Sequence, residues 1–116
     1  MRPTLAAAAL LVVLAGCGEQ GPPRDASKGE FCERFREVSA QTSWAKTQDA
    51  VGELRDVGTP GEIPRDAREG FLAITEQTAE AQDRAALVQK VESLGENTKR
   101  QVDAFNSYVR ATCPQR

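Results

Sequence analysis

Apolar residues recur at intervals of three and four along most of the chain, from Phe31 to Val109. This spacing indicates helices with one buried face, because an α-helix completes a turn every 3.6 residues. No stretch alternates strictly between apolar and polar residues, as a half-buried strand would. The pattern therefore predicts an all-α fold, a small antiparallel bundle of three to four helices over residues 27–116.

The first two helices have recognisable start and stop signals. Ser27 is followed three residues later by Glu30, an arrangement typical of a capping box, so a helix is expected from there to about Gln41. A second helix is expected over roughly Trp44–Val57, because Gly58 follows as a stop signal.

Two further helices are predicted in the second half of the chain. The third opens at Pro64, whose fixed φ suits a first helical position, and extends to about Gln82. The last is expected from about Arg84 to Thr112, with a bend or a short break at Gly95, because glycine weakens a helix interior.

The first sixteen residues differ from the rest of the chain. Arg2 supplies a positive charge, an apolar run extends from Leu5 to Ala15, and Gly16 and Cys17 follow. A helix that spans a membrane needs roughly 20 apolar residues, so a permanent transmembrane anchor is the weaker alternative. The region is interpreted as a signal peptide that is removed.

The residues Leu14-Ala15-Gly16-Cys17 resemble the lipobox of bacterial lipoproteins. In that family a peptidase cuts before a cysteine that already carries diacylglycerol, so the resemblance implies cleavage between Gly16 and Cys17 and a lipid on Cys17. Two acyl chains suffice for stable membrane attachment. The expected location is therefore the extracytoplasmic face of the cell membrane, with the membrane itself as a partner. The alternative is an ordinary secretory signal that ends by chance in a cysteine.

The stretch from Gly18 to Ala26 contains two adjacent prolines and two glycines, and it lacks apolar periodicity. Such a composition predicts a flexible linker. The expected organisation has three parts, which are a removed signal peptide at 1–16, a lipidated cysteine with its linker at 17–26, and a helical domain at 27–116.

The two remaining cysteines are predicted to form a disulfide. With Cys17 assigned to the lipid, Cys32 and Cys113 are an even number in an oxidising compartment. They lie near the start of the first helix and at the end of the last, which meet at one end of an up-down-up-down bundle. A redox-active role is the weaker alternative, because the cysteines are not in a C-x-x-C motif.

Composition argues against several classes of function. The chain has 15 basic and 17 acidic residues and no basic patch, so nucleic acid is disfavoured as a partner. It has no histidine, and its only methionine is Met1, which removes the commonest general base and the usual haem and zinc ligands. Glycine-rich phosphate loops and G-x-S-x-G elbows are also absent from the sequence. We therefore expect a protein that is not an enzyme and holds no metal or cofactor.

Three residues are candidates for interaction. Trp44 lies between the first two helices, where it caps the core or serves as an exposed anchor for a partner. Pro60 and Arg65 belong to the segment Gly58–Phe71, which joins a stiff turn to a helix start whose free amides can receive an anion. The alternative for this segment is ordinary turn and capping chemistry.

Two pairs of carboxylates are spaced by four residues and would lie one helical turn apart. Such pairs can share a proton or a cation, although a solvated helix face is the simpler interpretation. The pairs are Glu76 with Glu80, and Glu92 with Glu96.

The domain also resembles small helical lipoproteins of uncharacterised function from actinobacteria. The resemblance rests on Phe31-Cys32 with Phe35, the stretch IPRDAREGF and the terminal Cys113. It implies a disulfide-closed helical domain on the outer membrane face, and it identifies no catalytic or binding residue. The expected function is a non-catalytic envelope protein whose surface contacts another protein. The alternatives are a carrier of a small apolar ligand between the helices and, less favoured, an enzyme.

Overall fold

The computed structural model describes residues 21–114 of the chain. Cleavage before Cys17 and the lipid on that cysteine are predictions that lie outside the described residues.

The described part of the chain is all-α, as the hydrophobic pattern predicts, and it contains no named strand. No helix within it is both long enough and apolar enough to cross a membrane. Its helices, in chain order, are α2 (Lys28–Ala40), α3 (Trp44–Val57), α4 (Arg65–Glu80), α5 (Arg84–Glu92) and α6 (Glu96–Thr112).

Short polar side chains begin three of these helices. The hydroxyl of Ser27 accepts a hydrogen bond from the Glu30 amide at 3.1 Å, which confirms the predicted start of α2. Ser43 and Asp83 accept equivalent bonds at the starts of α3 and α5. Each cap pairs an amide that would otherwise lack an intrahelical acceptor.

The helix predicted over 84–112 is interrupted, which adds one helix to the expected number. The amide of Ser93 bonds to the carbonyls of Gln89 and Lys90, which closes α5, and Gly95 then takes an extended conformation as the N-cap of α6. The short break expected at Gly95 is therefore confirmed. It places Glu92 and Glu96 on different helices, so they are not one turn apart on a common face.

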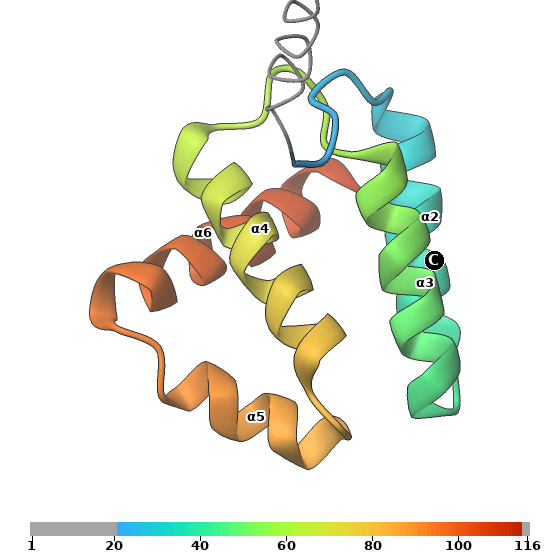
Figure 1. Cartoon of the computed structure of the whole chain (residues 1–116). Coiled ribbons are helices and arrows are strands. Elements are labelled where there is room, and N and C mark those ends of the chain that lie inside the picture. Colours follow the sequence, from blue (N-terminus) through green and yellow to red (C-terminus); the bar gives the residue numbers. More distant parts are fainter. Residues whose placement is uncertain (1–20, 115–116) are drawn as a thin grey trace, which may run out of the picture.

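Four of these helices form two packed pairs. In Figure 1, α2 and α3 lie side by side as an antiparallel hairpin, and α6 crosses behind α4. The crossing is close at Gly70, because a Cβ built there would clash with the backbone of Gln101 and Val102. A glycine at this point lets the two helix backbones approach each other.

Aromatic rings fill the centre, where α2, α4 and α6 meet. Phe31 and Phe71 are both 0 % exposed. The ring centroid of Phe105 lies 6.3 Å from that of Phe31 and 5.6 Å from that of Phe71. These separations fall in the range in which aromatic pairs attract each other beyond their burial of area.

The Cys32–Cys113 disulfide is present, as predicted. It joins the first turns of α2 to the residue after α6, with the two Cα atoms 5.4 Å apart. Both cysteines are buried and belong to the same apolar cluster as the aromatic rings.

Candidate functional site

Two of the three predicted interaction residues line the same pocket. Its volume is about 430 Å³, and three of its lining side chains are arginines, so we call it the arginine pocket. It is formed by the N-terminal segment, the α3–α4 loop and the first turns of α4, through Arg24, Pro60, Gly61, Ile63, Arg65, Arg68 and Glu69.

Arg68 is the buried member of this pocket, with 5 % of its surface exposed. One terminal nitrogen, Nη1, donates to the Pro23 carbonyl at 2.9 Å and to the Thr59 hydroxyl at 2.8 Å. The other, Nη2, donates to the Pro22 carbonyl at 2.7 Å. Its guanidinium also lies 5.9 Å from the centre of the Phe71 ring, within reach of a cation–π interaction. Arg68 therefore binds the N-terminal segment to α4.

Backbone hydrogen bonds complete this attachment. The Thr59 amide donates to the Pro23 carbonyl at 3.0 Å, and the Ala26 amide donates to the Thr59 carbonyl at 3.1 Å. Gly58 makes the approach feasible, because its φ of 87° suits glycine and a Cβ there would clash with the Pro23 carbonyl.

These contacts correct the prediction of a flexible linker over 17–26 for its described part, residues 22–26. Pro22 is buried, and residues 22–26 belong to the folded domain. The physical reason is that a proline has a restricted backbone and a free carbonyl, so Pro22 and Pro23 offer Arg68 two acceptors at a small cost in conformational entropy.

The charge of Arg68 is not neutralised by its hydrogen bonds. Its acceptors are two carbonyls and one hydroxyl, all uncharged, and its Nε has no partner among residues 21–114. Burial lowers the pKa of Arg68, and the nearby charges of Arg24 and Arg55 lower it further, while Glu69 raises it. An arginine remains charged even so, because its ordinary pKa is far above neutral.

The start of α4 adds to this positive environment. Pro64 is its N-cap and makes no side-chain capping bond, so the first amides of the helix are not capped in the way that Ser27 caps α2. Free amides and the helix dipole favour an anion at such a position. Arg24 and Arg65 are both exposed on the rim.

Trp44 lies elsewhere, at the junction between α3 and the end of α4. Its indole N–H donates to the Ala81 carbonyl at 3.0 Å, and the Arg84 guanidinium lies 5.6 Å from its ring. Gln48 donates from the same side to the Thr78 and Ala81 carbonyls. The side chain is half-buried, so Trp44 joins two helices while part of its ring stays accessible.

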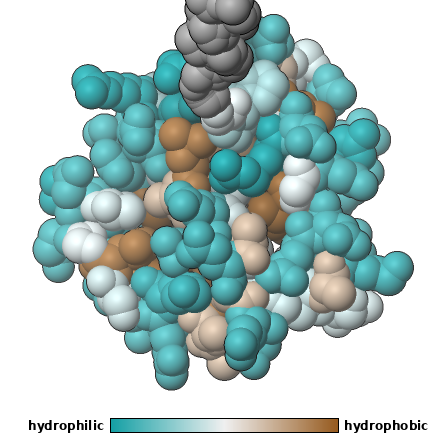
Figure 2. Space-filling model, viewed as in Figure 1, coloured by the Kyte–Doolittle hydropathy of each residue, from teal (hydrophilic) through white to brown (hydrophobic). Residues whose placement is uncertain are grey.

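Helix α5, which begins at Arg84, is the least packed element. It contains no buried residue. Its Val88 is 51 % exposed, and among residues 21–114 no other large apolar side chain is strongly exposed. Figure 2 shows a largely hydrophilic face on which apolar residues are scattered in small patches. We call Trp44, Arg84 and Val88 the α5 surface.

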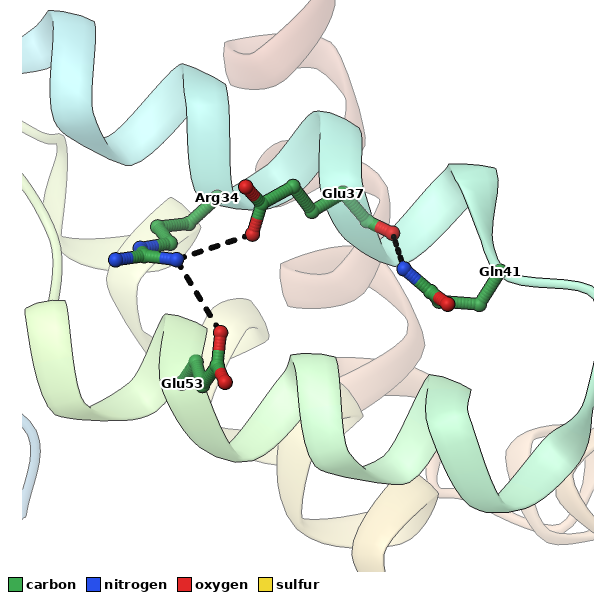
Figure 3. A network of polar contacts seen from close by, with 4 residues as sticks. All are labelled: Arg34, Glu37, Gln41 and Glu53. Atoms are coloured by element: carbon green, nitrogen blue, oxygen red, sulfur yellow. Dashed lines mark hydrogen bonds and ion pairs between the residues drawn. The ribbon is translucent and has the colours of Figure 1, made fainter.

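Arg34 links the two helices of the hairpin (Figure 3). It bonds to Glu37 at 3.1 Å and to Glu53 of α3 at 3.2 Å. The hydrogen bond and charge of Glu37 raise the pKa of Arg34. The partners are exposed, so the network is a surface feature that contributes little to stability.

The remaining carboxylates do not assemble a site. Glu76 and Glu80 are both exposed on α4. Within residues 21–114, no group of three acidic or cysteine side chains is arranged to hold a metal ion.

Sequence reasoning missed Arg68. Its position three residues before Phe71 places it on the apolar face of α4, and a charged residue on such a face is the signal that was present. Its partners lie 45 and 46 residues away in the chain, which the local pattern does not reveal.

Neither a family model, nor a curated protein, nor a solved structure matches this chain.

Proposed function

We propose that this chain is a membrane-anchored lipoprotein of the cell envelope, without a catalytic role, whose helical domain contacts another envelope protein. The anchor is supported by Leu14-Ala15-Gly16-Cys17, which resembles a lipobox. The single structural observation that carries the proposal is the attachment of Pro22 to α4 by Arg68.

This attachment shortens the connection between domain and lipid. Pro22 lies five residues after Cys17. Even a fully extended chain therefore separates the two residues by at most ~18 Å. The domain is then held close to the membrane, and the end that carries Pro22 faces it.

The α5 surface lies at the opposite end of the domain. In Figure 1 the N-terminal segment, in blue, is at the top, while α5 and the start of α3 are at the bottom. A protein partner in the envelope would therefore meet Trp44, Arg84 and Val88 first. Tryptophan and arginine are the residue types most enriched among side chains that dominate binding energy at interfaces.

Site-specific crosslinking in cells tests the proposal. A photoreactive amino acid placed at Val88 is expected to give adducts with a partner, whereas the same group at exposed Arg36 on α2 serves as the matched control. A second control is a lipoprotein with an unrelated domain. Adducts from Val88 that do not exceed both controls would refute the interaction.

The anchor has its own test. Intact-mass measurement of the protein from membranes is expected to show a diacylglyceryl adduct that Cys17→Ser abolishes, while Cys32 and Cys113 stay bonded to each other. A wild-type mass without lipid would end the proposal of a lipid anchor.

The alternative of an apolar carrier lacks a supporting observation. Phe31, Phe71 and Phe105 pack against one another at the centre, where a ligand between the helices would have to lie. A reproducible added mass in native mass spectrometry would revive it.

A further inference from the structure

Arg68 is a buried cation whose bonded partners supply no negative charge. Buried charged groups are normally paired, because transfer of an ion out of water is costly. Here three uncharged oxygens satisfy the two terminal nitrogens, and Nε is left without a partner in the described chain. The site therefore has positive charge that a bound anion would compensate.

The surroundings of Arg68 increase this positive charge. Arg24 and Arg65 line the arginine pocket with it, and Glu69 is the one acid in the lining. The same pocket opens on the uncapped start of α4, where free amides favour an anion. The lining thus contains three arginines and one glutamate, and Asp66 in the first turn of α4 is a further acid near the pocket.

We propose that the arginine pocket binds a phosphate group, held by Arg24 and Arg65 on the rim and favoured by the charge of Arg68 beneath. Guanidinium groups match phosphate oxygens with paired hydrogen bonds, which makes arginine well suited to this ligand. The pocket volume of about 430 Å³ admits a phosphate together with the group that carries it.

Two sources of this ligand share the same chemistry, a soluble phosphate and the phosphate of a membrane lipid headgroup. The lipid source rests on the proposed function, since a lipid on Cys17 would hold Arg24, seven residues further on, close to the headgroups. Phosphate binding itself does not depend on the anchor.

The test uses the full protein purified from membranes. In neutral detergent, amide hydrogen exchange at residues 60–69 and the melting temperature are measured in sodium phosphate and in sodium chloride of equal ionic strength. In a second arm, the protein is placed in nanodiscs of phosphatidylcholine, whose phosphate is offset by the choline cation, alone or mixed equally with phosphatidylglycerol, whose phosphate carries no such counter-charge. The lipid on Cys17 is checked by mass in the same preparation, so a missing anchor is distinguished from a missing phosphate site.

Substitutions on the rim of the arginine pocket test whether Arg24 and Arg65 hold the phosphate. Arg24→Gln with Arg65→Gln removes two exposed guanidinium groups and leaves Arg68 in place, and Arg36→Gln with Arg110→Gln is the control of equal charge. A single Arg65→Gln variant is used if the double variant fails to fold.

At a phosphate concentration ten times its dissociation constant, the ratio of folded to unfolded protein is expected to rise about 11-fold. The rim variant is expected to weaken binding roughly tenfold or more, and the control to leave it unchanged. Protection in only one arm supports the site and identifies its source. Equal protection by chloride, or undiminished phosphate binding in the rim variant, overturns the proposal.

Discussion

The end of the domain that carries Pro22 and the end formed by α5 are stabilised in different ways. At the first, a buried arginine and backbone hydrogen bonds fix a segment whose composition predicts flexibility. At the second, a helix with a suitable apolar composition contains no buried residue. The difference shows two separate sources of order. Residues 22–26 are held by contacts with distant residues, whereas α5 forms with little packing because its residues favour a helix and Asp83 caps it.

The largest expected effect is the loss of the disulfide. Cys32→Ser with Cys113→Ser removes a cross-link between residues 81 apart, which costs about 4 to 5 kcal/mol in the chain-entropy model. Such a loss is comparable with the whole stability of a small domain. Thermal unfolding followed by circular dichroism measures it, and an unchanged melting temperature would contradict the structural role of the bond.

A smaller effect is expected from Arg68→Met, which keeps the apolar stem and removes the guanidinium. The Pro22 carbonyl loses its donor and the Pro23 carbonyl keeps only the Thr59 amide, so we expect a loss of roughly 2 to 3 kcal/mol. The Ala26 and Thr59 amides should then exchange faster with solvent than in the wild type. Arg65→Met, on the exposed side of the same helix, should stay within about 0.5 kcal/mol. If these amides remain protected in the Arg68 variant, the attachment does not depend on Arg68.

Trp44→Phe separates the hydrogen bond of the indole N–H from the contact between its ring and Arg84. It removes the hydrogen bond to Ala81 and keeps an aromatic ring beneath Arg84, so urea unfolding is expected to show a loss of about 1 kcal/mol. The loss is limited because Gln48 still donates to the Ala81 carbonyl. A loss above roughly 3 kcal/mol would instead place Trp44 among the core residues.

The smallest effect is expected at Val88. Val88→Ser changes an exposed side chain, so stability should shift by no more than about 0.5 kcal/mol. The same substitution should reduce the crosslinks of the α5 surface to its partner if that surface is the interface. A large loss of stability would show that α5 is packed more firmly than its exposure indicates.

Much of the helical scaffold could be predicted because its signals are local. Ser27 and Glu30 indicate the start of α2, Gly58 marks the end of α3, and the apolar spacing identifies the core faces. The pairing of Cys32 with Cys113 followed from the number of cysteines and the helix order. The sequence indicates only Pro60 and Arg65 of the residues that line the arginine pocket as candidates, because the central contacts of the pocket join α4 to a segment about 45 residues earlier.

The disulfide also has a consequence for damage to the chain. It closes a covalent ring from residue 32 to residue 113 that includes each loop between the described helices α2 to α6. A protease that cuts once within this ring, for example in the exposed turn at Ser93, leaves two pieces that remain joined to each other. A nicked domain would therefore not shed a fragment until the bond is reduced or a second cut is made.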